Sequence, residues 1–340
     1  MGRLHIHRLL IALATVMALA APIRPAISAA APVEAGSTPV DPAVVQIDTE
    51  IDYQNAFGTG TGFVISPGGE VLTNFHVVQG ADVINAHNVG TGQNFPVDLI
   101  GYDRTHDIAL VQLRGAAGLP TAPLGNSAQV AVGDAAVAIG NAGGPGSPPT
   151  HEVGTVTQLG RTVDAKDALT GSSDQLNGLI EVAANVRAGD SGGPLVNGAG
   201  QVIGVTTAAT VNYRFAPGGK GFAIPINQAL AIADQIRARA PSDTVHIGPP
   251  TVLGVGVAGG EQRESLPGVI IREALRGGPA EQAGLVDGDI LTSIDGAPLD
   301  SATALTYVLD RHYPGDVVDL TWIDRSGQQR TGKATLAAGP

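Results

Sequence analysis

Gly189-Asp190-Ser191-Gly192-Gly193-Pro194-Leu195 is the stretch of this 340-residue chain that says most about its fold and chemistry. A serine hydroxyl is a weak nucleophile near neutral pH, so it needs a base to take its proton and donors to bind the resulting oxyanion. Glycines around Ser191 allow the sharp turn that aims main-chain N–H groups at one point. Gly189 and Ser191 are the natural pair of donors. The heptad therefore predicts a nucleophilic serine with an oxyanion hole, provided that a histidine and an acid lie elsewhere in the chain.

Two upstream segments offer that histidine and that acid. The apolar runs 62–65 and 71–73 flank the turn-forming residues 66–69 and predict a β-hairpin, and His76 follows its second strand. Asp107 begins another strand-like run, where an acid is expected to be buried and to need a partner. In a catalytic triad the acid holds the histidine in one tautomer, and the histidine takes the proton of the serine. The predicted triad is His76, Asp107 and Ser191.

Each of these residues also has a purely structural interpretation. A lone histidine beside apolar residues is commonly a satisfied core residue, and Asp107 alone would be a strand or turn cap. Three matching segments in the right order favour catalysis. Some of the remaining histidines lie in the leader, the linker or the second domain. The others are not flanked by a comparable sequence motif, or are expected to point to the opposite face of a strand. Together, these remaining histidines are His5, His7, His87, His106, His151, His246 and His312.

The three segments resemble the triad motifs of trypsin-like serine proteases and, within that clan, those of the HtrA (Deg) family. Thr-Asn-x-His-Val-Val, Asp-Ile-Ala-Leu and Gly-x-Ser-Gly-Gly-Pro-Leu are all matched. The resemblance covers roughly residues 55–339 and is greatest to secreted actinobacterial members with a single PDZ domain. It implies a mainly β fold: two six-stranded β-barrels with the triad between them, followed by a small α+β PDZ domain.

The chain divides into five expected segments. These are a signal peptide at 1–31, a loose lead-in at 32–50, a trypsin-like protease domain at 51–239, a linker at 240–250 and a PDZ domain at 251–339. Arg3 and Arg8 precede an apolar run and a small-residue site, as in export signals. The apolar run 9–23 is shorter than the roughly 20 residues that span a bilayer, which favours a cleaved signal over an uncleaved anchor.

Composition narrows the class of function. The net charge of −12 repels phosphate backbones, so nucleic acid is not an expected partner. The absence of cysteine excludes a thiol nucleophile, a cysteine zinc site and disulfides. The histidines show no metal-ligand spacing such as His-Glu-x-x-His, so neither a metal nor another cofactor is expected.

Two positions near the serine bear on structure and specificity. Many family members carry Asn where this chain has Asp190, and in trypsin-like zymogens an aspartate there pairs with a newly created N-terminal amine. No Ile-Val-Gly-Gly-like activation site occurs here, so Arg187 is the candidate partner of Asp190. The resemblance places Asn185 at the bottom of the primary specificity pocket, with Val186 beside it. Because no acid is available there to pair with Lys or Arg, we expect cleavage after small or medium aliphatic residues.

The C-terminal segment resembles a PDZ domain. Leu253, Gly254 and Val255 lie where the family's carboxylate-binding loop would be, and residues 277–285 match its helix signature. Backbone N–H groups at such a turn can bind a terminal carboxylate while the peptide adds a strand to the sheet. Leu305 and Val308, on a predicted helix at 301–311, should face this groove. The alternative is a PDZ fold that serves only as packing or as a spacer.

These features predict a secreted serine endopeptidase that hydrolyses unfolded or misfolded polypeptides and binds C-terminal or extended peptides through its PDZ domain. The alternative is a chaperone-like binding protein with a latent protease domain. A carboxylesterase is disfavoured because its Gly-x-Ser-x-Gly elbow needs a βα unit after the serine, whereas 195–198 reads as a strand and turn. The family favours a homotrimer, in which Tyr53 and Phe57 are either contact residues or core residues.

Overall fold

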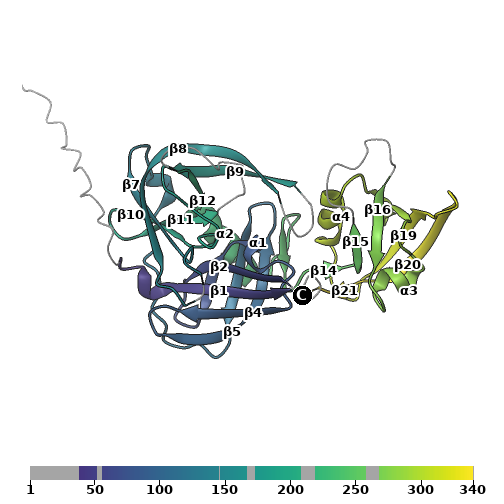
Figure 1. The fold of residues 1–340 in the computed structure, drawn as a ribbon, viewed down its shortest axis with the longest axis horizontal. Coiled ribbons are helices and arrows are strands. Elements are labelled where there is room, and N and C mark those ends of the chain that lie inside the picture. Colours follow the sequence, from purple (N-terminus) through teal and green to yellow (C-terminus); the bar gives the residue numbers. More distant parts are fainter. Residues whose placement is uncertain are drawn as a thin grey trace, which may run out of the picture.

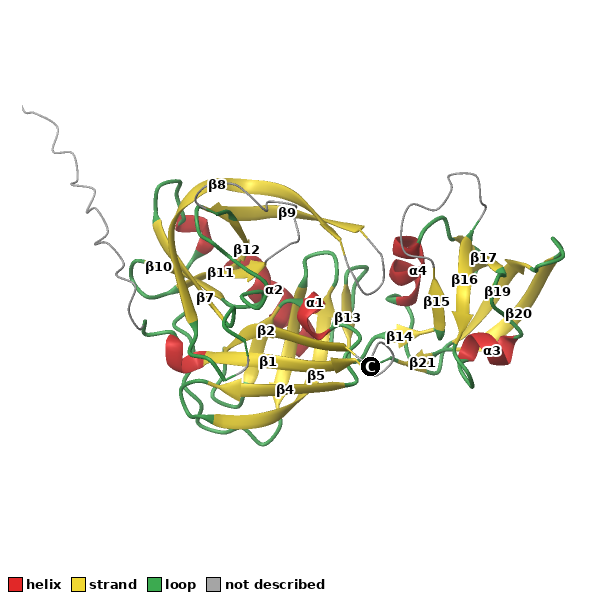
Figure 2. Cartoon of the chain, viewed as in Figure 1, coloured by secondary structure: helices red, strands yellow, loops and turns green. Residues whose placement is uncertain are grey.

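The computed structural model describes residues 38–51, 56–144, 146–166, 173–207, 219–257 and 268–339. The expected signal peptide and Tyr53 lie outside these ranges. Two β-barrels built from residues 44–225 lie beside a smaller α+β part that follows residue 250 (Figures 1 and 2). The predicted fold class is therefore confirmed. None of the helices in the described ranges has the length and apolar character needed to cross a bilayer.

Six antiparallel strands form the first barrel in the described chain, in the order β5-β4-β1-β2-β3-β6, and pairing of β5 with β6 closes it. The predicted hairpin is confirmed, because Phe63 pairs with Leu72 across β2 and β3. The strands are β1 (Val44–Ile51), β2 (Ala56–Val64), β3 (Glu70–Thr73), β4 (Val83–Asn88), β5 (Gln93–Asp103) and β6 (Ile108–Leu113). A 3-10 turn, η1 (Asp41–Ala43), precedes β1, and the short helix α1 (Phe75–Val78) follows β3.

The second barrel is also closed, in the order β10-β11-β12-β9-β8-β7 over the described residues. Its strands are β7 (Ala135–Gly140), β8 (Thr150–Lys166), β9 (Ser173–Val182), β10 (Pro194–Asn197), β11 (Val202–Thr207) and β12 (Gly221–Pro225). A second 3-10 turn, η3 (Ser127–Gln129), lies between the barrels in sequence. Small and branched aliphatic side chains fill both interiors, which suits narrow barrels of this strand number.

Helix α2 (Ile226–Arg237) follows β12 and packs on the first barrel and β11. The predicted apolar face is largely confirmed, since Ile226, Ala229, Ala233 and Ile236 are buried, while Leu230 is half-buried. Part of the expected linker then forms β13 (Val245–Ile247), which pairs with the end of β5. This segment is therefore a strand of the first sheet as well as a connection.

The C-terminal part contains a sheet in the order β15-β16-β17-β19-β20, with β18 paired to β17. Its strands are β15 (Val255–Val257), β16 (Val269–Ala274), β17 (Ile290–Ile294), β18 (Ala297–Pro298), β19 (Val317–Ile323) and β20 (Gln329–Thr335). Helices α3 (Pro279–Ala283) and α4 (Ala302–Leu309) cover it, as the sequence predicted. The short strands β14 (Thr251–Val252) and β21 (Ala337–Ala338) pair with each other in a separate two-stranded sheet. A separate apolar cluster, which includes Leu320 and Trp322, forms its core.

Candidate active site

The fold brings the predicted acid and base to one end of the first barrel. Strands β3 and β6 are neighbours, and Thr73 pairs with Ala109. His76 lies in α1 directly after β3, and Asp107 directly precedes β6. The main-chain oxygen of Asp107 accepts hydrogen bonds from Asn74 Nδ2 at 2.9 Å and from the backbone N of Phe75 at 3.3 Å. The turn that carries the histidine is thus bound to the turn that carries the acid.

The Asp107 carboxylate holds His76 at two points. Oδ1 accepts from the backbone N of His76 at 3.0 Å, and Oδ2 lies 2.8 Å from ring Nδ1. Because an ionised carboxylate only accepts hydrogen bonds, Nδ1 carries the ring proton and Nε2 is left as the basic nitrogen. Thr207 Oγ1, from β11 of the second barrel, donates to Oδ2 at 3.2 Å. Asp107 is buried, whereas the His76 side chain is 41% exposed.

Ser191 lies at the junction of the two barrels. Its carbonyl oxygen accepts from the backbone N of Thr61 at 2.8 Å, and the next residue, Gly192, donates to the Thr206 oxygen at 2.7 Å. Gly192 has a φ of +83°, and a Cβ there would lie 2.1 Å from Thr61 O and 3.0 Å from Asn74 N. Only glycine fits this position. The serine loop is therefore seated between the histidine turn and the strand that supplies Thr207, which joins the three predicted segments.

Gly189 adopts the backbone conformation that an oxyanion turn needs. Its φ is +97°, and its carbonyl oxygen faces inward, accepting from Thr61 Oγ1 at 2.7 Å and from the Asn141 backbone N at 3.2 Å. A Cβ at this residue would lie 2.7 Å from Asn141 O. Within the described chain, the Gly189 N–H has no hydrogen-bond acceptor. The role of this N–H as an oxyanion donor stays a prediction.

Asp190 does not pair with the guanidinium of Arg187, contrary to the sequence-based expectation. Its Oδ2 accepts from the backbone N of Arg187 at 2.9 Å, while Oδ1 accepts from the Ala142 backbone N at 3.1 Å and Thr150 Oγ1 at 2.9 Å. The exposed Arg187 side chain instead pairs with Glu152 at 2.8 Å. Burial raises the pKa of the Asp190 carboxyl, and these hydrogen bonds oppose that rise. The carboxylate thus binds the serine loop to Ala142 and Thr150.

Sequence reasoning missed the hydroxyl groups that assemble this junction. Thr61, Thr73 and Thr207 are almost fully buried. Thr73 Oγ1 donates to Thr61 O at 2.7 Å, and Thr61 Oγ1 accepts from the Asn141 backbone N at 2.9 Å. Polar residues inside otherwise apolar strands are a usable signal, because a buried hydroxyl needs a partner.

The predicted specificity residues lie beside the serine loop. Asn185 is exposed and Val186 is half-buried. A Cβ on Gly219 would lie 2.7 Å from Asn185 Cα, and one on Gly221 would lie 2.3 Å from a Val186 methyl. The segments 184–186 and 219–221 therefore lie side by side. Residues 208–218, which precede the second segment, lie outside the described ranges.

The predicted peptide loop of the C-terminal part has its carbonyl groups already bonded. Leu253 O accepts from the Ala280 backbone N at 2.9 Å, and Gly254 O accepts from the Leu275 backbone N at 2.9 Å. Gly254 has a φ of +74°. The loop leads into β15, which is the edge strand of its sheet, beginning at Val255. An edge strand beside a glycine turn is the arrangement that strand addition by a peptide requires.

Two further observations concern partners. Phe57 is 80% exposed, so of its two sequence-based interpretations the core one is wrong. Among the described residues, no group of three or more His, Cys, Asp or Glu side chains could hold a metal ion.

Comparisons with known proteins agree with this geometry. Residues 60–205 match the family model of the trypsin-like peptidase domain, and residues 244–323 match that of the PDZ domain. The chain is 33% identical over 309 residues to HhoA of Synechocystis sp., named a serine protease, covering 79% of this chain and 75% of HhoA. It is 33% identical to the serine protease PepD of Mycobacterium tuberculosis, covering 89% of this chain and 66% of PepD. Other relatives, of which the chain spans only about half to three fifths, are named periplasmic serine endoproteases.

Among solved structures, the chain is similar to the HtrA-type protease AlgW with a tripeptide. The TM-score is 0.51 at 28% sequence identity, and the match covers 88% of this chain and 95% of AlgW. The two family models together match both the barrels and the C-terminal sheet. The chain belongs to the HtrA family of trypsin-like serine proteases, with a PDZ domain after the protease domain.

Proposed function

We propose that this protease cleaves peptide bonds through an acyl-enzyme on Ser191, with His76 as general base and Asp107 as its orienting acid. The observation that carries the proposal is the two-point hold of Asp107 on His76, 3.0 Å to the backbone N and 2.8 Å to Nδ1. This hold fixes the ring plane and leaves Nε2 to accept a proton. His76 takes the Ser191 proton as the hydroxyl attacks the carbonyl carbon, and the imidazolium then protonates the leaving amine. Water reverses the path and releases the acid product.

The oxyanion formed in each step would be bound by the N–H groups of Gly189 and Ser191. Gly189 supports this role because its positive φ and inward carbonyl leave its N–H without an internal acceptor in the described chain. Such fixed donors are worth most where charge develops in the transition state. Asp190 supports the same turn by accepting hydrogen bonds from the backbone N of Arg187, within the serine loop, and from that of Ala142, in the neighbouring loop.

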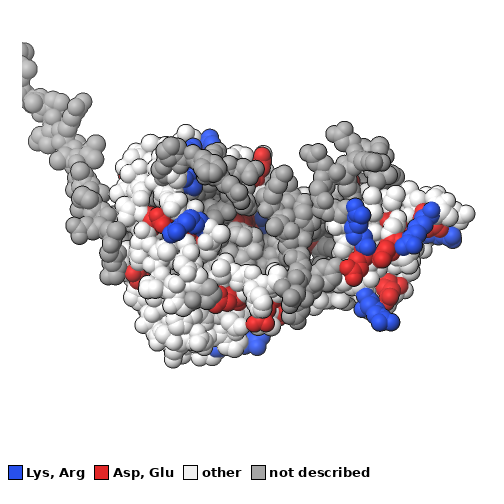
Figure 3. Space-filling view, viewed as in Figure 1, with Lys and Arg blue, Asp and Glu red and all other residues white. Residues whose placement is uncertain are grey.

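The proposed substrates are unfolded or misfolded polypeptides cut after small or medium aliphatic residues. Asn185 and Val186 bring no charge to the segment beside the serine loop. The barrel face in Figure 3 is mainly uncharged, whereas Lys, Arg, Asp and Glu gather over the PDZ domain. An uncharged face suits extended apolar chains better than basic ones.

The PDZ domain is proposed to bind C-terminal or extended peptides at Leu253, Gly254 and Val255, alongside β15. The solved structure of the related AlgW contains a tripeptide, which supports peptide binding by this chain in general. Export is supported by the periplasmic names of relatives and by the leader-like residues 1–31. A homotrimer is supported by the exposed Phe57 near the start of β2.

Turnover of unfolded casein by the mature chain tests the catalytic part of this proposal. Ser191→Ala should lose on the order of a million-fold in kcat, because the nucleophile and its base act as a unit. The same variant should bind casein as well as the unmodified chain does. A chain that binds casein without cleaving it, with or without Ser191, would instead be a chaperone-like binding protein. Hydrolysis of short esters without hydrolysis of casein would point to an esterase.

A further inference from the structure

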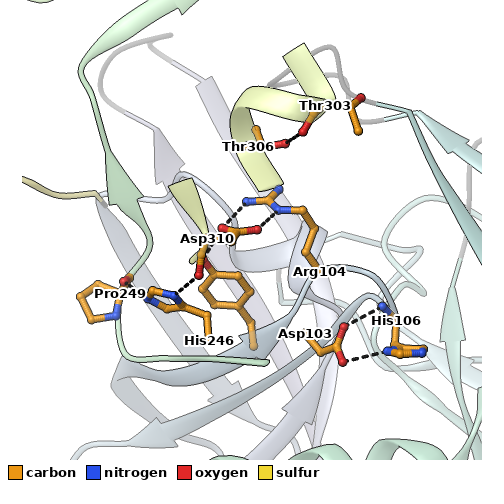
Figure 4. A network of polar contacts seen from close by, with 9 residues as sticks. Asp103, Arg104, His106, His246, Pro249, Thr303, Thr306 and Asp310 are labelled. Atoms are coloured by element: carbon orange, nitrogen blue, oxygen red, sulfur yellow. Dashed lines mark hydrogen bonds and ion pairs between the residues drawn. The ribbon is translucent and has the colours of Figure 1, made fainter. Parts of the chain in front are cut away.

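A half-buried carboxylate of the PDZ domain contacts the protease domain (Figure 4). Asp310 directly follows α4. Its Oδ1 accepts from Tyr102 Oη at 2.6 Å, and Arg104 donates to both oxygens, from Nε at 2.5 Å and from Nη2 at 3.2 Å. Tyr102 belongs to β5, and Arg104 comes just after that strand. One PDZ side chain thus accepts three hydrogen bonds from the first barrel.

This contact is desolvated on both sides. The side chains of Arg104 and Asp310 are 8% and 13% exposed, and Tyr102 is fully buried. Burial and the neighbouring Asp310 carboxylate raise the pKa of Tyr102 far above its ordinary value, so its hydroxyl remains a donor. A forked guanidinium and a hydroxyl together fix the orientation of the Asp310 carboxylate. The contact of Asp310 with Tyr102 and Arg104 is therefore held in a single geometry.

The groups that bind Asp310 also contact the residues flanking the proposed catalytic pair. The Tyr102 ring stacks on Phe75 at 4.0 Å, and the Arg104 guanidinium lies over the Phe75 ring at 4.8 Å. Phe75 immediately precedes His76. The Arg104 oxygen accepts from the backbone N of Asp107 at 3.1 Å. Tyr102 and Arg104 thus support both the histidine turn and the acid turn.

A second set of contacts holds the Asp310 main chain in place. His246, on β13, is buried with Nδ1 at 2.9 Å from Asp310 O and Nε2 at 2.9 Å from Pro249 O. Its ring stacks between Tyr102 at 5.0 Å and Tyr313 at 4.6 Å. The end of α4 is therefore fixed to the same aromatic stack that ends at Phe75.

We infer that Asp310 is a positioning residue of the protease, contributed by the PDZ domain. It orients Tyr102 and Arg104, these fix Phe75, and Phe75 with Arg104 fixes the alignment of His76 with Asp107. The inference rests on the proposed roles of His76 and Asp107. It assigns the PDZ domain a part in catalysis on substrates too short to reach the peptide loop.

The test uses the full mature chain and a chromogenic tetrapeptide with an aliphatic residue before the cut. Asp310→Ala should lower kcat about tenfold with KM unchanged, since small misplacements of catalytic groups cost up to about a hundredfold. Tyr102→Phe, which keeps the ring stack and removes only the hydroxyl, should lower kcat by a smaller factor. Asp310→Asn, which keeps one acceptor oxygen, should recover part of the loss. The control is Asp319→Asn, a PDZ carboxylate in an exposed pair with Lys333, which should leave kcat unchanged.

A folded Asp310→Ala variant with unchanged or higher kcat, or with only KM altered, would overturn the inference. If Asp310→Ala does not fold, Tyr102→Phe decides by the same criterion. The ¹H–¹⁵N signal of His76 Nδ1–H in Ser191→Ala gives a readout that needs no turnover. It should shift or broaden when Asp310→Ala is added, and an unchanged signal would also overturn the inference. If the proposed function itself is wrong, the unmodified chain will show no turnover that depends on Ser191. That result is distinct from a failure of the inference about Asp310.

Discussion

Replacing Asp107 by asparagine tests how His76, the proposed catalytic base, is held. An asparagine that keeps its oxygen toward the backbone N of His76 must turn its NH₂ group toward Nδ1, where the Asp107 oxygen now lies at 2.8 Å. Since NH₂ only donates, Nδ1 must accept and the ring proton moves to Nε2. The opposite side-chain orientation would set NH₂ against the backbone N–H. Either way, the nitrogen that should take the Ser191 proton loses that ability or its alignment.

The expected loss is about 10⁴-fold in kcat, the size of the effect when a triad histidine is held in the wrong tautomer. At 1.36 kcal/mol per tenfold change, this corresponds to about 5.4 kcal/mol of transition-state stabilisation. The change in folding stability should be far smaller, about 1–2 kcal/mol, because asparagine has the same shape and keeps one hydrogen bond. Activity and stability should therefore separate clearly.

The assay is steady-state turnover of a quenched fluorescent peptide, with thermal unfolding measured on the same samples. Asp41→Asn is a matched control, because Asp41 also pairs with a histidine, His151, with both oxygens 3.0–3.1 Å from Nε2. It should keep the unmodified kcat. A stable Asp107→Asn variant that retained more than a tenth of kcat would show that this pair does not set the tautomer of the catalytic base.

Three further predictions concern the serine loop. Gly189→Ala should lower kcat by roughly a hundred- to a thousand-fold, because its Cβ would meet Asn141 O at 2.7 Å and displace the proposed oxyanion donor. Single-turnover acylation rates would check this, and an unchanged rate would rule out Gly189 as that donor. Because burial raises the folded pKa of Asp190 above its ordinary 3.8, the carboxyl contributes most stability below pH 3.8 and loses it as pH rises through the folded pKa. In urea unfolding, the free energy of unfolding of Asp190→Asn should therefore rise relative to that of the unmodified chain as pH rises from about 4. A difference between the two free energies that does not change with pH would contradict the pKa shift. Asn185→Asp should raise cleavage after Lys or Arg in a peptide library, and an unchanged profile would remove Asn185 from the specificity pocket.

Sequence alone predicted the parts of this molecule that depend on local pattern. The hairpin before His76 and the strand after Asp107 follow from apolar runs and turn residues, and both are confirmed. The helix from Ile226 follows from apolar spacing and is confirmed as well. The fold class came from the resemblance of the triad motifs and is confirmed by the two closed barrels.

Contacts between distant side chains could not be predicted in the same way. Asp190 was expected to meet the Arg187 guanidinium, but its partner is the Arg187 backbone N–H, and which group of a residue reaches a carboxylate depends on the turn geometry. Asp310 and Arg104 are 206 residues apart, and no motif joins them. The contact forms because β13 places the linker on β5 and brings the end of α4 against the first barrel.

Covalent labelling by a fluorophosphonate, followed by peptide mapping, shows whether Ser191 is a nucleophile activated by His76. The mature chain should carry a single adduct on Ser191, and His76→Ala should slow its formation by several orders of magnitude because the base is gone. An adduct on another residue, or equal labelling rates with and without the His76 imidazole, would contradict the assigned chemistry.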